Sequence, residues 1–538
     1  MNILSKASPL ETTLANMTKS LNGICAVECS TVKHPLNNCY SVNMNYDKAP
    51  SHIYSNGKGS CEYSCSASAY GELIERLQTN NSFSYFYLPN RKHYPDELVF
   101  ELGGDYLNDE LKAIYNPSGE LEDEDLIDFN SDHDEGIIVL PFINLQTSQK
   151  VYFPINILAN LYVSNGLASG NTREEAWIQA LSEIIERHVK FEVIKNGYSL
   201  PLLDNQVLTN FPKLIADMEL LREKGYIVNA HDGSLGGKYP VTAISLINPQ
   251  NGTLFVSFGS HPILEVSLER TMTELMQGRD LDSLDGFEVP TFDMELVSSS
   301  MNMESHFVDS NGKMGIGFLS NKKSFELSPW VYDGNTMDDE FAFLTSLLYS
   351  LDKSIYMREY NHLGFYSTQI IVPEFSEVYA IDELIDNNKN RGKAVRDAVL
   401  NFADYDPADV LDAVEELSDA IDVGSYIGVI FEHSFSMLEF KIQLYILNRD
   451  GTNALNALGY MNERTPLQNA IFELLILKVL NKDINEYKDG LIALFTSEIY
   501  NEASDILECS KSLIDLTFDK QYEDILKLYD RVYAKHSN

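Results

Sequence analysis

The sequence predicts an α/β domain over residues 1–384, followed by an all-α region of helical hairpins over residues 385–538. In the first part, strand-like runs such as "GIIVLPFINL" and "YSTQIIVP" alternate with helical stretches, which is typical of α/β proteins. In the second part strand-like runs almost vanish, and apolar residues recur at spacings of three and four, as on one face of a helix. With 538 residues, 44% of them apolar, the chain can fill more than one core.

The predicted elements follow one another with short breaks. In the first part, "VTAISLINPQNGTLFVSFGS" predicts two strands joined by a turn at Asn251-Gly252, and "LERTMTEL" predicts the helix after them. In the second part, successive helices are predicted in "KAVRDAVLNF", "PADVLDAVEELSDAI", "SMLEFKIQLYIL", "PLQNAIFELLILKVL" and "YEDILKLYDRVYAK". We interpret them as stacked hairpins of the tetratricopeptide kind, although the full repeat consensus is absent.

The chain is strongly acidic, with 80 Asp and Glu against 40 Lys and Arg and a formal charge of −40. Such a surface repels phosphate backbones and anionic lipids, which argues against binding nucleic acid or a membrane through a broad basic face. We predict a cytoplasmic protein, because the start "MNILSKASPLETTL" lacks the apolar core of a signal peptide and no run reaches about 18 apolar residues. Six cysteines do not indicate a disulfide framework.

A short motif of two acids and an arginine occurs twice, as "ELIER" at residues 72–76 and as "EIIER" at residues 183–187. Each copy follows a glycine-rich segment, and its first glutamate lies 13 positions after the last glycine of that segment. One copy alone would favour a solvated helix face with a surface ion pair. The repeated spacing indicates an internal duplication, in which a glycine-rich loop leads into a helix. A looser third relative, "LERTMTEL", places Arg270 and Glu274 one turn apart.

Acids at this spacing suit magnesium. Mg²⁺ prefers hard oxygen ligands, and glutamates at i and i+3 share one helix face, so acids from several helices can converge on metal ions that hold a phosphate chain. The predicted metal ligands are Glu72, Glu75, Glu183, Glu186 and Glu274. Forked donors to phosphate oxygens would come from Arg76, Arg187 and Arg270. A P-loop is not predicted, because "NGKGS" around Lys58 lacks the required upstream glycine.

The stretches "SNGKG…GELIERL", "LYVSNGLASGNTREEA…ALSEIIER", "DGSLGGKYPV", "SFGSHP" and "LERTMTELMQGR" resemble the YcaO family. The resemblance covers most of the predicted first domain and implies a YcaO-type domain that binds ATP with Mg²⁺ through acids on several helices. It implies that the magnesium ligands are the five glutamates named above. The implied contacts of ATP are Lys6, Ser68, Arg76, Asn171, Glu175, Arg187 and Arg270, with Thr13 in the same pocket.

The resemblance also implies a function. Heterocycle-forming members use ATP to phosphorylate a backbone amide oxygen, and stand-alone members are described as accessory factors in the β-methylthiolation of a ribosomal protein. The implied activity is Mg²⁺-dependent cleavage of ATP, to AMP and pyrophosphate or with activation of an amide or carboxyl group. The implied partners are a radical methylthiotransferase or the ribosomal protein, and a second copy in a homodimer.

Two alternatives stay open. The chain ends "RVYAKHSN" where many azoline-forming members have a proline-rich tail, so direct azoline synthesis is not expected. The alternative to an ATP-cleaving enzyme is a nucleotide-binding adaptor without catalysis, which recruits a modification enzyme through the helical region 385–538. For that region, the alternative to recruitment is a role in dimerisation or stability alone.

Overall fold

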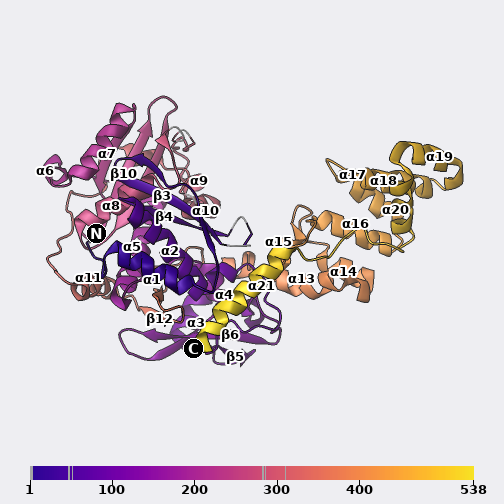
Figure 1. Ribbon diagram of the computed structural model, residues 1–538, viewed down its shortest axis with the longest axis horizontal. Coiled ribbons are helices and arrows are strands. Elements are labelled where there is room, and N and C mark those ends of the chain that lie inside the picture. The colour runs from indigo at the N-terminus through magenta and orange to yellow at the C-terminus, as the bar shows by residue number, and fades with distance from the viewer. Residues whose placement is uncertain are drawn as a thin grey trace.

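The computed structural model describes residues 4–46, 49–50, 53–281, 284, 286–308 and 310–537. An α/β body carries an arm of helices that extends from one side (Figure 1). The last helix, α21 (Lys520–Tyr533), runs from the root of the arm back to the body, so that both ends of the chain lie on the body. Among the described residues, no helix is long and apolar enough to span a membrane.

The described residues of the body form three antiparallel sheets. The first contains β1 (Val27–Cys29), β2 (Lys33–Leu36), β3 (Cys39–Tyr46) and β4 (Tyr54–Gly59). The second contains β9 (Ile227–Asp232), β10 (Val241–Asn248) and β11 (Thr253–Ser260). The third runs in the order β5 (Leu98–Glu101), β6 (Gly136–Asn144), β12 (Tyr356–Tyr360), β13 (Tyr366–Ile371) and β8 (Leu167–Gly170), with β7 (Lys150–Pro154) against β6. The alternation of strands and helices therefore produces antiparallel ladders, and no parallel ladder joins these strands.

Helices cover these sheets. Those of the body are α1 (Leu10–Leu21), α2 (Glu62–Gln78), α3 (Asp109–Tyr115), α4 (Ile155–Ile157), α5 (Arg173–Asn196), α6 (Asn205–Leu208), α7 (Pro212–Glu223), α8 (Leu264–Leu275), α9 (Met294–Ser298), α10 (Ser300–Val308), α11 (Met337–Ser350) and α12 (Glu383–Asp386). The longest, α5, starts where the Thr172 hydroxyl accepts a hydrogen bond from the Glu175 amide and ends at Gly197, whose φ is +62°. The predicted turn at Asn251-Gly252 is confirmed, because β10 and β11 pair on either side of it.

Among the described elements, β4 packs against α2, β8 against α5 and β11 against α8, which is in each case the helix that follows the strand. In each, a strand glycine lies against the helix. A Cβ atom on Gly57 would come within 1.9 Å of the Cys65 carbonyl, and one on Gly259 within 2.4 Å of the Thr271 hydroxyl. The predicted glycine-rich loops are therefore strands, and glycine is needed there because strand and helix backbones touch.

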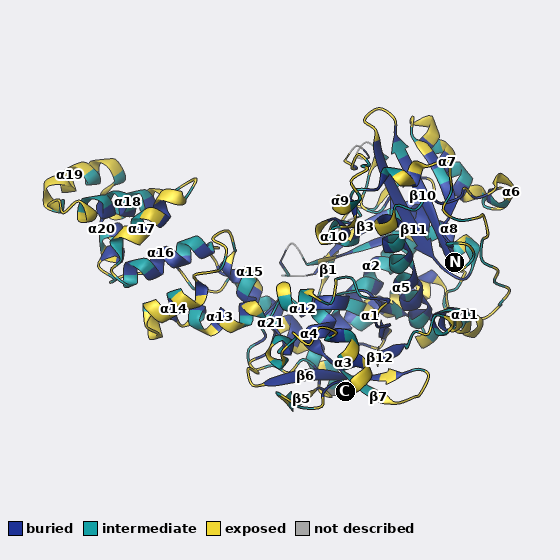
Figure 2. Cartoon of the chain, turned by 180° about the vertical axis from the view of Figure 1, so that it is seen from behind, coloured by how far each residue is buried: buried dark blue, intermediate teal, exposed yellow. Residues whose placement is uncertain are grey.

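The arm consists of short helices, as predicted for the second part of the chain. They are α13 (Arg391–Leu400), α14 (Pro407–Val414), α15 (Val423–Ile427), α16 (Met437–Leu447), α17 (Gly451–Tyr460), α18 (Pro466–Val479), α19 (Ile484–Phe495) and α20 (Ser497–Leu507). The far end has a small core of its own, which includes Ile446, Leu458, Ile471 and Leu507. Of the helices there, α19 buries none of its residues, whereas α18 and α20 each bury several (Figure 2).

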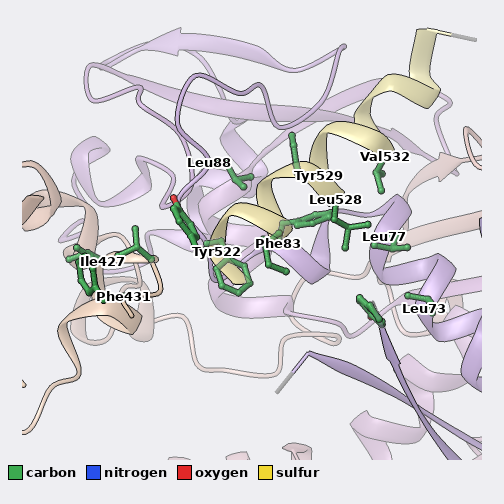
Figure 3. Close-up of a cluster of buried hydrophobic side chains, with 14 of the residues drawn as sticks. Leu73, Leu77, Phe83, Leu88, Ile427, Phe431, Tyr522, Leu528, Tyr529 and Val532 are labelled. Carbon is green, nitrogen blue, oxygen red and sulfur yellow. The ribbon is translucent and has the colours of Figure 1, made fainter. Parts of the chain in front are cut away.

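The helix α21 joins the arm to the body through a shared hydrophobic core. Its Tyr529 ring lies edge-on to Phe83 with ring centres 5.0 Å apart, next to the 3₁₀ helix η1 (Asn81–Phe83) that follows α2. The same core contains Leu73 and Leu77 of α2 and Phe431 of the arm (Figure 3). It crosses the predicted boundary between residues 384 and 385, and the division into two domains at that point stays a prediction.

Candidate functional site

A cavity of about 1010 Å³ lies in the body between β4, α2, α5, α8 and the segment before α1. All the predicted metal ligands and nucleotide contacts line it, although they are far apart in the sequence. They are Lys6, Thr13, Ser68, Glu72, Glu75, Arg76, Asn171, Glu175, Glu183, Glu186, Arg187, Arg270 and Glu274. The acids and arginines thus converge on one pocket, as the repeated motif predicts, while the role of each residue stays a prediction.

Two of the acids pair with the arginine one turn later on the same helix. On α2, Arg76 Nη2 lies 2.5 Å from Glu72 Oε1, and on α5, Arg187 Nη2 lies 2.7 Å from Glu183 Oε1. These four side chains are between 23% and 33% exposed, and all of them face the cavity. Neither copy of the motif therefore forms the solvated outer face that a single copy would have favoured.

Glu75 and Glu186 make no ion pair within the ranges that the structure describes. Burial is the largest cause that raises the pKa of each carboxyl, and the neighbouring Glu183 raises it further in both cases. Glu186 also accepts a hydrogen bond from the Ser260 amide at 3.2 Å. Ionisation of these two carboxyls is therefore unfavourable in the absence of a cation, as expected for carboxylates that bind a metal ion.

At the other end of the cavity, Glu175 is held in place by several partners. Its carboxylate lies 3.2 Å from Lys6 Nζ and accepts hydrogen bonds from the Ala7 amide and the Asn171 side chain, both at 3.1 Å. Thr13 in turn donates to Asn171 at 3.0 Å. Burial raises the pKa of Glu175, but Lys6 and these donors outweigh it and the net shift is downward. This ionised, ordered group is suited to polar groups of a nucleoside.

The arginines are oriented by contacts outside the acidic cluster. Arg187 donates to Asn165 Oδ1 at 3.3 Å, and its guanidinium lies 4.7 Å from the centre of the Phe307 ring. Arg270 donates to Gln179 Oε1 at 2.6 Å. Because these forked donors are already fixed, little rotational freedom remains to be lost when an anion binds.

Comparison with known proteins decides the family. Residues 56–376 match the family described as YcaO cyclodehydratase, ATP- and Mg²⁺-binding, which is more than half of the chain. The chain belongs to the YcaO family. ATP and Mg²⁺ are its cofactors, as the resemblance implied.

Relatives of this YcaO protein are known from two bacteria. The ribosomal protein S12 methylthiotransferase accessory factor YcaO of Escherichia coli K12 is 40% identical over 433 residues, which cover 78% of this chain and 74% of the relative. A protein of Haemophilus influenzae Rd, named only as uncharacterized, is 38% identical over 449 residues, which cover 80% and 76% of the two chains.

Solved structures resemble the chain more distantly. YcaO from Methanopyrus kandleri, bound with AMPPCP and Mg²⁺, is 17% identical, covers 71% of this chain and 94% of its own, and gives a TM-score of 0.45. A heterocyclase in complex with substrate and cofactor is 16% identical, covers 71% of this chain and 56% of its own, and gives 0.49.

The cavity of this YcaO protein fits Mg²⁺ held together with phosphate. Within the described chain, no three Asp, Glu, His or Cys side chains gather closely enough to hold one metal ion alone. Mg²⁺ commonly takes one or two carboxylates and completes its shell with water and substrate phosphates. Arg76 Nε and Asn56 Oδ1 are buried in the cavity wall without a hydrogen-bond partner, so the wall is incomplete without a polar ligand.

Two lysines in the cavity wall were not predicted as site residues. Lys58, on β4, pairs with Glu274 on α8. Lys190, on α5, donates to the His306 carbonyl at 2.6 Å, and burial lowers its pKa to about 7. The sequence holds a signal for both. Lys190 lies one helical turn after Glu186, on the same helix face. Lys58 lies between two glycines, so in a strand its side chain faces the side opposite to theirs.

Replacing Glu75 with glutamine should stabilise the ligand-free YcaO protein at neutral pH. Because folding raises the pKa of Glu75 above its ordinary value of 4.5, the folded state binds this proton more tightly than the unfolded chain does. The free energy of unfolding therefore falls as pH rises from 4.5 through the raised pKa. Glu75→Gln lacks this penalty and should gain about 1 kcal/mol or more at about pH 8.

Urea unfolding of both proteins between about pH 5 and pH 8 measures this effect. Glu120→Gln, in an exposed loop, is the matched control and should behave as the wild type. An identical pH dependence in wild-type and Glu75→Gln protein would show that Glu75 is ordinary in the folded state.

Proposed function

We propose that this YcaO protein binds ATP with Mg²⁺ in the cavity between α2, α5 and α8 and cleaves it. The observation that carries the proposal is the convergence of five acids and three arginines from three helices on one cavity. The acids hold Mg²⁺, and the arginines donate to phosphate oxygens. Bound Mg²⁺ supplies positive charge that offsets the charge of the phosphates. Cleavage yields AMP and pyrophosphate, or activates an amide or carboxyl oxygen of an acceptor.

The orientation of ATP follows from the charges on the cavity wall. The phosphates belong near Arg76, Arg187 and Arg270, where the guanidiniums lie beside the acids. The nucleoside belongs near Glu175 and Asn171, at the end formed by the segment before α1. A volume of about 1010 Å³ accommodates a ligand of this size together with metal and water.

We place this activity in the modification of a ribosomal protein. Support comes from the E. coli relative, whose name makes it an accessory factor of the ribosomal protein S12 methylthiotransferase. The partner is then the methylthiotransferase or the ribosomal protein, in the cytoplasm. The formal charge of −40 supports a protein partner over nucleic acid. Assembly as a homodimer and a tetratricopeptide-like arrangement of the arm are further parts of the proposal.

Turnover is tested by incubating the pure protein with Mg²⁺ and ATP and resolving AMP, ADP, phosphate and pyrophosphate. We expect AMP and pyrophosphate from the wild type and from Glu120→Gln, and loss of both from Glu72→Gln. A thermal shift with ATP should accompany this and should disappear when EDTA removes the metal. Absence of any product above the Glu72→Gln level, with the thermal shift retained, would favour the adaptor.

The adaptor function rests on a different observation. The arm projects away from the body, and α19 at its far end buries none of its residues (Figure 2). Extended helical arrays commonly bind protein partners along such surfaces. In this case ATP binding would order the body, and the arm would recruit the modification enzyme without consuming ATP.

A further inference from the structure

Lys58 differs from Arg76 and Arg187 in that its acidic partner lies on another element. Arg76 and Arg187 each pair with an acid of their own helix, whereas Lys58 comes from β4 and reaches Glu274 on α8. It lies between Gly57 and Gly59, which pack against α2 and leave no room for a Cβ atom on that side. Because side chains alternate along a strand, this packing turns Lys58 toward the cavity.

The ammonium group of Lys58 lies among acids from all three helices. Besides its partner Glu274, its strongest favourable electrostatic neighbours are Glu186, Glu183 and Glu72. The side chain is 33% exposed, and the space it faces is the cavity itself. A single positive charge is therefore shared by acids that are proposed to hold metal.

An ammonium group and Mg²⁺ compete for these oxygens. Both are compact, strongly hydrated cations, and both would approach the Glu274 carboxylate from the cavity. They repel each other at close range, where the charges are shielded from bulk water. Mg²⁺ can bind fully only after Lys58 has left, and the flexible stem of lysine allows it to leave without moving β4.

A bound nucleotide would offer the Lys58 ammonium group a second anionic partner. Phosphate oxygens that enter beside α2, α5 and α8 bring negative charge within reach of the same ammonium group. We propose that Lys58 is the internal counter-ion of the metal-binding acids, and that it passes from Glu274 to a phosphate oxygen when Mg²⁺ and ATP enter together. Metal binding thereby depends on nucleotide. This inference rests on the proposed function, in that it takes the acids as metal ligands.

The direct test measures metal binding without nucleotide. Mn²⁺ serves as a paramagnetic probe for Mg²⁺, and its affinity is measured by electron paramagnetic resonance on the full-length protein. We expect weak binding to the wild type, and binding at least about tenfold tighter to Lys58→Met and Lys58→Gln, because the competing charge is gone. Lys112→Met removes a surface lysine of α3 that pairs with Asp105, ahead of that helix; it is the matched control and should bind Mn²⁺ as the wild type does.

Folding of the variants is part of the same test. Removal of Lys58 leaves the acids without their counter-ion, so the metal-free variants should be less stable than the wild type, and Mn²⁺ alone should restore them. A variant that folds only with Mn²⁺ supports the proposal, because the metal then replaces the missing charge. Equal Mn²⁺ affinity in wild type and folded variants, or a destabilised variant that Mn²⁺ does not rescue, would overturn it.

A second titration separates this inference from the proposed function. Calorimetric binding of ATP at saturating Mg²⁺ should be about tenfold weaker in Lys58→Met, because a charged donor to phosphate is lost. Wild-type protein that binds no ATP would refute the proposed function, whereas the Mn²⁺ comparison would still decide the role of Lys58. Wild-type binding of ATP with no change of Mn²⁺ affinity in the variants would refute only the role of Lys58.

Discussion

Arg187→Ala should weaken ATP binding by about one to two decades while the metal-binding acids stay in place. The guanidinium is fixed by Glu183, Asn165 and the Phe307 ring, and it faces the cavity. A charge-assisted hydrogen bond to phosphate contributes about 1.5 to 3 kcal/mol, and alanine removes it without changing the carboxylates. Calorimetric titration with ATP at saturating Mg²⁺ measures the loss.

Glu183→Gln should act on the metal instead. It removes an anionic ligand and leaves the arginine, so a higher Mg²⁺ concentration should be needed to reach the same ATP binding. The two variants therefore separate in a titration that varies Mg²⁺ at fixed ATP and then ATP at fixed Mg²⁺. Arg173→Ala, which removes an exposed arginine near the start of the same helix, is the matched control. Unchanged ATP affinity in Arg187→Ala together with an unchanged Mg²⁺ requirement in Glu183→Gln would reduce the repeated motif to a structural ion pair.

The second large effect is expected from α21, at the other side of α2. Tyr529 is 1% exposed, packs against Phe83 and donates a hydrogen bond to the His93 carbonyl at 3.1 Å. Loss of a large buried aromatic side chain costs about 3 to 5 kcal/mol, and Tyr529→Ala also leaves a carbonyl without its donor. Urea unfolding should show this loss, and Lys527→Ala on the exposed face of the same helix should show almost none.

Removal of α21 should therefore affect the ATP site. Leu73 and Leu77 of α2 share the core of Tyr529 (Figure 3), and Glu72 and Arg76, which directly precede them on α2, line the cavity. A protein that ends at residue 519 should lose both folding stability and ATP binding. Full stability of that truncated protein would show that α21 is only an attachment of the arm.

Deletion of α17–α20, the outer helices of the arm, should leave the ATP site unaffected, in contrast to removal of α21. Arg449 donates to the Leu507 carbonyl at 3.1 Å, so the chain leaves α16 and returns from α20 at nearly the same place. A short Gly/Ser linker can replace residues 450–506 and keep α21. This deletion should spare ATP binding, because it disrupts a core that is separate from the one shared by α2 and α21. It should abolish any binding of the proposed protein partner, which a pull-down with the methylthiotransferase would measure.

Local features of the chain were determined by the sequence alone. Apolar periodicity located α16 and α18, the repeated motif located α5, and the turn at Asn251-Gly252 located the β10–β11 hairpin. The spacing of Glu183 and Glu186 placed both acids on one side of α5. These features were predictable because each depends on residues within a few turns of one element, where the helical or strand period fixes which side chains share a face.

Only the tertiary structure decided how these elements meet. The sequence predicted Glu274 as a site residue but not Lys58, because the pair forms only when β4 and α8 both line one cavity. The glycines before α2 appeared as a loop in the sequence, and contact with the helix makes them a strand. No local sequence pattern predicts that Tyr529 of α21 packs against Phe83. Such contacts join residues hundreds of positions apart, and they are selected by burial and charge complementarity in the folded chain, which no repeating pattern along the sequence records.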